Sequence, residues 1–307
     1  MIKSHRLFIH ILAFLFFSNS WSWAHSLRMD GYSSATTSQA GVDGTITVPS
    51  TPTKEDLIFD FDLGAAKSHS KTTNTDTTEN SLGFAVTTPT WWSFRAGFLA
   101  SRNPDENLNT AEPSISVAKK LYYSETGKKE DGSSAFDPFV KLSLKGSRSY
   151  MIQTSATSRS TAVFSLQQGS ASLGIFWQPL ENWTFELRGT SYNYNRDIKA
   201  LYGLLGSYPY LTQLSSRLST INDTISSLPE SSSSLSVGYI LNSDWDFTLE
   251  YQRTRDLISG LYGTSSKLSL QWAFLSSWSL QFGVGNTVQS DTNEKSNLSE
   301  LSLAYYF

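Results

Sequence analysis

The chain has 307 residues, of which 17% are charged and 13% are aromatic, a lower charge content than soluble enzymes of this size usually carry. Its 24 Lys and Arg against 27 Asp and Glu leave no positive excess to hold a phosphate backbone, so nucleic acid is not an expected partner. The absence of cysteine excludes disulfides, thiolate metal sites and a cysteine nucleophile, and four histidines leave little imidazole chemistry. We therefore expect no enzyme, no metal site and no cofactor.

Residues 1–24 have the composition of an export signal. Lys3 and Arg6 charge the front, an uncharged apolar run covers 7–17, and Ala24 ends a cleavage site of small residues. The alternative is an uncleaved membrane anchor, but this run is shorter than the roughly 20 residues that a spanning helix needs. The sequence therefore predicts a signal peptide and an exported protein.

Residues 25–55 form a polar segment rich in Ser, Thr and Gly, with Pro49 and Pro52 near its end. Such a segment has too few apolar residues to bury a core of its own. We expect a flexible periplasmic lead to the domain that follows. The alternative is that the segment occupies the interior of that domain as a plug.

From residue 56 onwards, short runs alternate apolar and polar residues, which is the pattern of strands with one apolar face. In the run 183–188, Trp, Phe and Leu alternate with Thr, Glu and Arg. Twelve strands are expected in all, at 56–64, 81–88, 92–100, 113–121, 136–146, 163–178, 183–195, 233–241, 245–254, 266–275, 278–287 and 298–307.

A short repeat recurs four times where two strands meet: a turn of a few polar residues, then Trp, one residue, and Phe or Leu. The repeat places four indole rings beside one set of turns, at Trp92, Trp183, Trp245 and Trp278. Because indole has an apolar body and a polar N–H, such a row suits a membrane interface. A soluble sandwich with buried Trp is the alternative, but it has no reason to place its aromatics beside one set of turns.

The other connections are longer and rich in Ser, Thr and Asn. They cover about 65–80, 101–112, 147–160, 196–232, 255–265 and 288–297. Alternating short and long connections are typical of a transmembrane barrel with short periplasmic turns and longer outer loops. The sequence thus predicts an all-β fold, a closed antiparallel transmembrane β-barrel of about 12 strands over residues 56–307.

The last residues alternate again, with Leu301, Leu303, Tyr305 and the terminal Phe307 on one face. This segment resembles the closing strand of Gram-negative outer-membrane β-barrel proteins. The resemblance implies a location in the bacterial outer membrane, contact with its lipid, and assembly by the barrel-assembly machinery, which would recognise Leu303, Tyr305 and Phe307. It indicates an architecture and no particular subfamily.

Polar strand positions are expected to face the lumen, because Lys or Arg facing lipid at mid-membrane costs about 2–4 kcal/mol. The candidate lumen-lining residues carry both signs of charge: Asp60, Asp62, Arg95, Lys141, Lys145, Glu186, Arg188, Glu250 and Lys267. Paired across the interior, they would lock a narrow barrel, whereas solvated they would line a weakly selective pore. Lys119 is an exception, since it falls on the lipid-facing phase of its strand unless a bulge shifts the register.

Two features could suggest catalysis, and both have simpler interpretations. Asp60 and Asp62 could form a carboxylate pair, but both follow the inward period of their strand. Barrel enzymes of this size use a Ser with a His, or a His with carboxylates, and His69 alone could serve. It lies between Lys67 and Lys71 in a predicted outer loop, so we expect a solvated loop residue.

The longest predicted outer loop, 196–232, contains a helical pattern of apolar residues at three- and four-residue steps. Pro209 suits the first turn of this helix, and Pro229 follows where the pattern ends. An apolar stripe on an outer loop needs cover, either across the barrel mouth or against a partner. The residues expected to constrict the mouth are Leu211, Leu214, Leu218 and Ile221.

The function that these features favour is a passive, porin-like channel for small hydrophilic solutes, since the strands have polar inner faces and about twelve strands can enclose a pore. The alternative is a structural or surface-interaction barrel with a closed lumen, which binds partners through its outer loops. An enzyme is a distant third interpretation.

Overall fold

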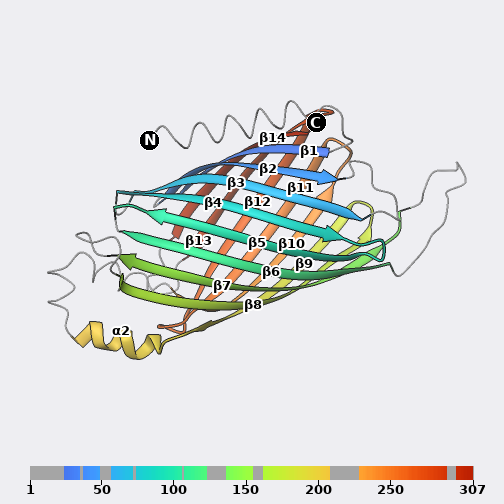
Figure 1. The fold of residues 1–307 in the computed structure, drawn as a ribbon. Coiled ribbons are helices and arrows are strands. Elements are labelled where there is room, and N and C mark those ends of the chain that lie inside the picture. Colours follow the sequence, from blue (N-terminus) through green and yellow to red (C-terminus); the bar gives the residue numbers. More distant parts are fainter. Residues whose placement is uncertain are drawn as a thin grey trace, which may run out of the picture.

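The computed structural model describes residues 24–34, 37–48, 57–71, 74–105, 107–122, 136–154, 162–207, 228–288 and 295–306. These residues form a closed antiparallel β-barrel with a short helix at one rim (Figure 1). The strands are β1 (Ala24–Ser34), β2 (Thr37–Val48), β3 (Ile58–Ser70), β4 (Thr75–Thr87), β5 (Trp92–Asn103), β6 (Leu108–Tyr122), β7 (Phe139–Thr154), β8 (Ala162–Leu180), β9 (Trp183–Tyr194), β10 (Pro229–Ile240), β11 (Trp245–Asp256), β12 (Tyr262–Leu275), β13 (Trp278–Val288) and β14 (Lys295–Tyr306). The helix, α2, spans Ile198–Ser207 and follows β9.

Each strand pairs with its neighbours in the chain, and β14 returns to pair with β1, so the barrel has no open edge. In this closing pair, Ser26 lies opposite Tyr306 and Ser34 lies opposite Leu298. The first strand, β1, therefore begins at the end of the barrel where the last strand, β14, ends. We call this the terminal end. We call the opposite end, where α2 lies in Figure 1, the helix end.

The barrel has 14 strands, whereas the sequence predicted about 12. Each of the twelve predicted segments overlaps one strand from β3 to β14, and the two additional strands, β1 and β2, cover 24–34 and 37–48, almost entirely within the predicted segment 25–55. The flexible lead or plug expected there is therefore wrong for the described part of that segment. Outward positions of these strands do carry apolar residues such as Met29 and Val42, but Gly31 and Gly44 occupy other outward positions and interrupt the apolar period. Backbone pairing with β14 and β3 holds the two strands in the wall.

Most strands also extend further toward the helix end than the apolar period indicated. Most of the predicted loops 65–80 and 101–112 is strand, because β3 continues to Ser70 and β4 begins at Thr75, while β5 continues to Asn103 and β6 begins at Leu108. Backbone pairing continues beyond the apolar part of the wall, for example where Ser70 lies opposite Thr75. The sequence predicted long connections at one end of the barrel and short turns at the other. The long β9–β10 connection at the helix end agrees with this prediction, whereas the β6–β7 connection at the terminal end is long where a short turn was expected.

The β9–β10 connection is anchored to the barrel rim at both of its ends. The N–H of Ala200 donates to Oδ1 of Asp197 at 3.0 Å, which caps the start of α2. Ile198 then packs against Leu166 and Leu228, and all three are buried. The described part of the connection thus begins and ends in one apolar cluster at the helix end.

Most of the sequence pattern that predicted a helix in this connection lies in 208–227, outside the described residues. The same holds for the four residues expected to constrict the mouth, Leu211, Leu214, Leu218 and Ile221. Mouth constriction therefore stays a prediction. Among the described residues, no helix is long and apolar enough to cross a membrane.

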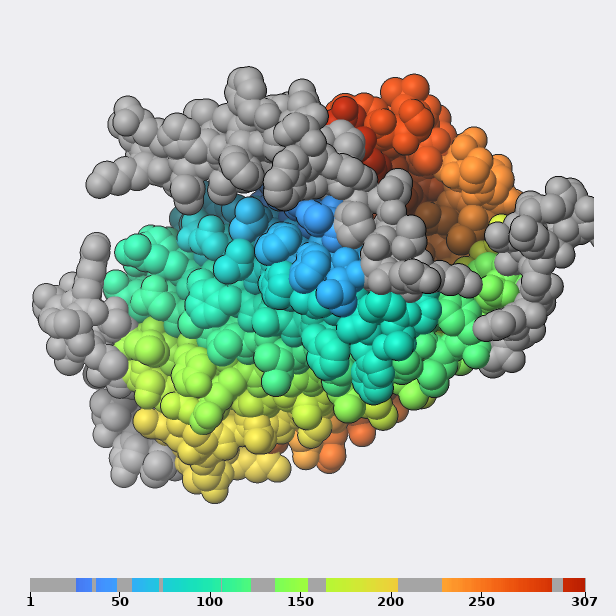
Figure 2. Space-filling model, turned by 45° about the vertical axis from the view of Figure 1, so that its right-hand side comes forward, coloured from blue at the N-terminus to red at the C-terminus, as the bar shows by residue number. Residues whose placement is uncertain are grey.

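The barrel is apolar outside and polar inside. Large apolar side chains are exposed at outward positions around the wall: Phe61, Leu63, Leu82, Phe94, Ile115, Leu144, Leu173, Leu187, Leu235, Leu249, Leu268, Phe282 and Leu301. Figure 2 shows one side of this outer wall, where side chains of the N-terminal half of the chain pack side by side. Because a water-soluble barrel would bury such side chains, the outer surface is built to contact hydrocarbon.

Candidate functional site

The lumen is the candidate site because charged side chains from many strands converge on the inner face of the wall. Residues directly opposite each other on paired strands point to the same face. Asp60 lies opposite Ala85, which lies opposite Arg95, and Arg95 lies opposite Ser116, which lies opposite Lys145. By the same register, the nine residues predicted to line the lumen share this inward phase.

Six of these nine residues border one cavity of about 680 Å³: Asp60, Arg95, Lys141, Lys145, Glu186 and Arg188. Five of the eleven other bordering residues are Ser or Thr, with Ser114, Ser116 and Ser143 among them. Such side chains keep the wall hydrophilic without filling the space. The volume lies within the range of about 300–1,000 Å³ that is typical of small-molecule sites.

A chain of ion pairs lines the wall from β11 to β1. The ammonium of Lys267 lies 3.2 Å from a carboxylate oxygen of Glu250 and 3.1 Å from one of Glu300. Glu300 also lies 3.6 Å from the guanidinium of Arg28, whose Nε donates to Asp30 at 2.7 Å. Both cations on this part of the wall therefore have carboxylate partners.

Sequence reasoning missed three members of this chain, for two different reasons. Glu300 lies in a predicted strand and alternates with Leu301, so its inward phase could have been found. Arg28 and Asp30 were missed because their segment was expected to be flexible, although they also alternate with an apolar residue, Met29.

A second ion pair crosses a whole strand. Arg95 on β5 pairs with Asp62 on β3, although β4 lies between them. The intervening position is Gly83, where an added Cβ would lie 2.8 Å from Oδ2 of Asp62. The glycine therefore leaves the space that lets the two side chains meet.

Asp60 and Asp62 are held by separate partners. The hydroxyl of Thr47 donates to Asp60 at 2.7 Å, and the hydroxyl of Thr45 donates to Asp62 at 2.9 Å. These contacts are those of luminal side chains held against their own wall. They supply no feature that a paired acid/base site would need.

The inner wall of β6 and β7 carries a different kind of cluster. Lys120 lies directly opposite Lys141, and Lys145 lies further along β7 on the same face. The ammonium of Lys120 lies 3.7 Å from the ring centroid of Phe139 and 4.7 Å from that of Tyr122. Within the described part of the chain, none of these three lysines forms an ion pair.

Sequence reasoning also missed Lys120 and the rings around it. Phe139 is followed by Val140 and then Lys141, so it shares the inward phase of that lysine. Phe176 on β8 lies opposite Lys141, and its ring centroid lies 5.7 Å from that of Phe139. The sequence analysis expected apolar residues to face lipid, so it did not predict aromatic rings that face the lumen.

Lys119 faces outward, as the period of its strand predicted. It lies opposite Trp92 on β5 and Leu142 on β7, with no register shift near it. Its ammonium donates to the carbonyl oxygen of Thr90 in the turn at the terminal end and lies 5.2 Å from the Trp92 ring centroid. The charge therefore lies at the rim of the apolar surface, so no bulge is needed to accommodate it.

The aromatic residues of the terminal end form contacts from strand to strand. Trp183 contacts Tyr239 with ring centroids 4.8 Å apart, and Trp278 contacts Tyr305 at 4.6 Å. Trp245 stacks on a residue of β12, Trp272, at 5.4 Å. The four Trp residues singled out in the sequence thus share one end of the wall, and their role at a membrane interface stays a prediction.

At the helix end, His69 lies in β3 and not in a loop, because the strand extends past its apolar part. Its Nδ1 lies 2.9 Å from Oδ1 of Asp76, and the ammonium of Lys67 lies 2.6 Å from the other carboxylate oxygen. These hydrogen bonds, first from Lys67 and then from His69, lower the pKa of Asp76, which lies beyond the membrane-facing part of the wall. Across the described ranges, no group of three or more His, Asp or Glu could hold a metal ion.

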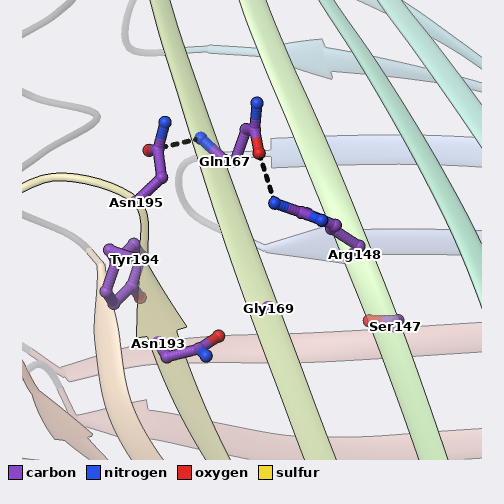
Figure 3. A pocket seen from close by; sticks show the side chains of 7 residues that line it. All are labelled: Ser147, Arg148, Gln167, Gly169, Asn193, Tyr194 and Asn195. Atoms are coloured by element: carbon purple, nitrogen blue, oxygen red, sulfur yellow. Dashed lines mark hydrogen bonds between the residues drawn. The ribbon is translucent and has the colours of Figure 1, made fainter.

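A smaller polar pocket lies near the helix end of β7, β8 and β9 (Figure 3). In Figure 3, Arg148 points toward Gln167 and donates to its side-chain oxygen at 2.6 Å. The backbone N–H of Gln167 donates to the side chain of Asn195 at 2.9 Å. These contacts tie the ends of the three strands together where the β9–β10 connection begins.

A closed barrel with an apolar outer surface and a polar inner surface is suited to a lipid bilayer, which solvates the apolar outer surface. The architecture is that of an outer-membrane β-barrel. Its location is the bacterial outer membrane, since barrels of this kind span that membrane.

No protein-family model matches the chain, and no curated protein matches it either. Several solved barrels are similar in structure at low sequence identity. The KdgM porin in complex with disordered oligogalacturonate is 10% identical with a TM-score of 0.41, and the match covers 92% of this chain and 99% of that one. OccK11 (OpdR) of Pseudomonas aeruginosa is 10% identical with a TM-score of 0.43, covering 93% and 95%. CdiB from Acinetobacter baumannii is 10% identical with a TM-score of 0.49, covering 93% of this chain and 60% of that one.

Proposed function

We propose that this barrel is a passive channel for small hydrophilic solutes across the outer membrane. The observation that carries the proposal is how the luminal charges are arranged. Every ion pair that the described residues form on the inner face joins strands at most two apart, as Asp62–Arg95 and Lys267–Glu300 do. The pairs therefore run along the wall and do not tie opposite walls together.

The cavity beside Arg95 and Lys141 supports the same function. Its border combines hydroxyls with charges of both signs, and such a surface stays hydrated. A barrel of 14 strands is wider than the eight-stranded barrels whose interiors are filled by side chains. A continuous water-filled path along the barrel lumen is therefore expected.

A barrel with a closed lumen is the second candidate, and one observation favours it. Leu166 points inward near the helix end, where it is fully buried against Ile198 and Leu228. This apolar cluster narrows one side of the mouth. If the lumen is closed, the function would lie in the β9–β10 connection, which would bind a partner at the cell surface.

Single-channel recording of the purified, folded protein in planar bilayers distinguishes the two candidates. A channel gives discrete conductance steps, and a Trp placed inside the cavity should reduce them. We expect Ser143→Trp to lower conductance, since Ser143 borders the cavity. The matched control is Leu142→Trp, whose side chain faces outward and is 41% exposed. Absence of conductance from correctly folded wild-type protein would contradict the channel.

A further inference from the structure

The inner wall of β6 and β7 concentrates positive charge that forms no ion pair with any described residue. Lys120 and Lys141 lie directly opposite each other, and like charges in that position destabilise a strand pair. Lys145 adds a third ammonium two inward positions along β7 from Lys141. Lys141 and Lys145 are exposed to the lumen.

The carboxylates that border the same cavity are engaged elsewhere. Glu186 accepts a hydrogen bond from Arg188 at 2.6 Å, and Asp60 accepts one from Thr47 at 2.7 Å. The luminal cation on β12, Lys267, instead has two carboxylates within 3.2 Å. Among the described residues of the inner wall, positive charge without a carboxylate partner is therefore concentrated on β6 and β7. A diffusible anion bound there would reduce the repulsion between the lysines.

Aromatic rings lie beside these lysines, at positions where most of the inner wall has Ser, Thr or Gly. Phe139 and Phe176 stack at 5.7 Å with an interplanar angle of 24°. Both rings border the cavity together with Lys120 and Lys141. An inward ring in a hydrated lumen offers a flat apolar surface to a solute that passes it.

Hydrogen-bond donors complete this part of the wall. The hydroxyls of Ser116 and Ser143 border the cavity between the lysines, and Ser143 also donates to the carbonyl oxygen of Gly174 at 3.3 Å. Gly174 has no side chain, and a Cβ there would lie 2.5 Å from Oγ of Ser143. The glycine therefore leaves room for the Ser143 hydroxyl, and the cavity is bordered by ammonium groups, hydroxyls and aromatic rings together.

We propose that this surface, formed by Lys120, Lys141, Lys145, Phe139 and Phe176, is a binding site for small organic carboxylates that carry an aromatic ring. The inference deepens the channel function and rests on it for the role of the site in transport. The ammonium groups bind the carboxylate, and the two Phe rings contact the ring of the solute. Because Lys141 and Lys145 are exposed to the lumen, binding is weak enough for release, as conduction requires.

The test uses three probes: benzoate, which has a carboxylate and a ring; acetate, which lacks the ring; and benzyl alcohol, which lacks the charge. In planar bilayers under a KCl gradient, the reversal potential should show a preference for chloride over potassium. Benzoate should then reduce the chloride current at lower concentration than acetate does, and benzyl alcohol should leave it unchanged.

Two variants separate charge from ring, and one is a matched control. Lys120→Gln with Lys141→Gln should raise the half-blocking concentration of benzoate by about fivefold, as expected for losing two solvated charge contacts, and should shift the reversal potential toward potassium. Phe176→Leu should raise the half-blocking concentration of benzoate but not that of acetate. Lys119→Gln removes a neighbouring charge on the outward face and should change neither.

Binding measured without conduction distinguishes failure of the site from failure of the channel. Line broadening of benzoate by NMR, with the folded full chain in detergent micelles, reports the site whether or not the barrel conducts. Broadening that the double Lys variant abolishes, with no conductance, would support the site and overturn the channel. Conductance with potassium preference, or with a benzoate effect equal in wild type and the double variant, would overturn the site and leave the channel.

Discussion

Lys267 on β12 reaches Glu300 on β14 at 3.1 Å by crossing the strand between them, β13. The crossing is possible because the residue opposite Glu300 is Gly283, where an added Cβ would lie 3.2 Å from the Glu300 Cβ. Asp62 and Arg95 cross β4 at Gly83 in the same way. Glycines on the inner wall thus allow charges to pair along the wall across an intervening strand.

Gly283→Ala tests this relationship, because the new methyl group must displace Glu300 by a few tenths of an ångström. We expect the free energy of unfolding to fall by about 1 kcal/mol, the usual contribution of one hydrogen bond. Unfolding by urea from lipid vesicles measures it. The control is Gly189→Ala, where a new Cβ would meet nothing within 4 Å and should cause no loss. Equal losses in both variants would mean that the wall tolerates no added methyl group, whatever the ion pair.

Leu187 and Arg188 are neighbours on β9 with opposite environments. Leu187 faces outward and is 55% exposed, whereas Arg188 faces the lumen and pairs with Glu186 at 2.6 Å. Leu187→Arg should lower the free energy of unfolding by about 2–4 kcal/mol, because it places a charge in hydrocarbon. Arg188→Leu should be milder and change mainly ion selectivity. Equal destabilisation, measured by the same unfolding experiment, would contradict the register or the membrane assignment.

The closing strand should matter for assembly as well as for stability. Tyr306 pairs with Ser26 across the closure, and the next residue, Phe307, was predicted to act in assembly. Deleting Phe307 should reduce the amount of folded barrel in the outer membrane. Cell fractionation and heat-modifiable gel mobility measure that amount, with Lys295→Gln at the other end of β14 as the control. Normal accumulation of the deletion variant would contradict the assembly role.

Segment 208–227 should affect permeability if it covers the mouth. Its flanks are tied to the rim by Ile198 and Leu228, so a short Gly/Ser linker in its place should leave the barrel folded. We expect larger single-channel conductance and faster entry of large solutes in liposome swelling. A linker variant with unchanged permeability and unchanged cell-surface binding would show that the segment neither constricts the mouth nor binds a partner.

Much of the wall could be predicted from the sequence, because a barrel strand with an apolar outer face has a period of two. That period located twelve strands and assigned both Leu187 and Arg188 to the faces that the register supports. It also assigned Lys119 to the outer face, which the structure bears out. The assignment needs no knowledge of which strands are neighbours, since successive side chains on any strand point to opposite faces.

The apolar period of β1 and β2 is short, because small residues interrupt it. Met29 and Val42 face outward, but Gly31 and Gly44 occupy other outward positions, so the segment was expected to be polar and flexible. Backbone pairing with β14 and β3 holds these two strands in the wall. An interrupted period in a segment rich in Ser, Thr and Gly is a weak signal for a strand when the neighbouring strands are not known.

The sequence by itself determined the strand period, the charge on each face and the aromatic turns, all of which depend on residues close together in the chain. Only the tertiary structure decided that 14 strands close the barrel, that Arg95 meets Asp62, and that Lys120 and Lys141 lie opposite each other without a carboxylate partner among the described residues. Pairing in a closed barrel depends on register between strands, and register is set by the apolar patterns of both partners and by the turn that joins them, which no single strand specifies.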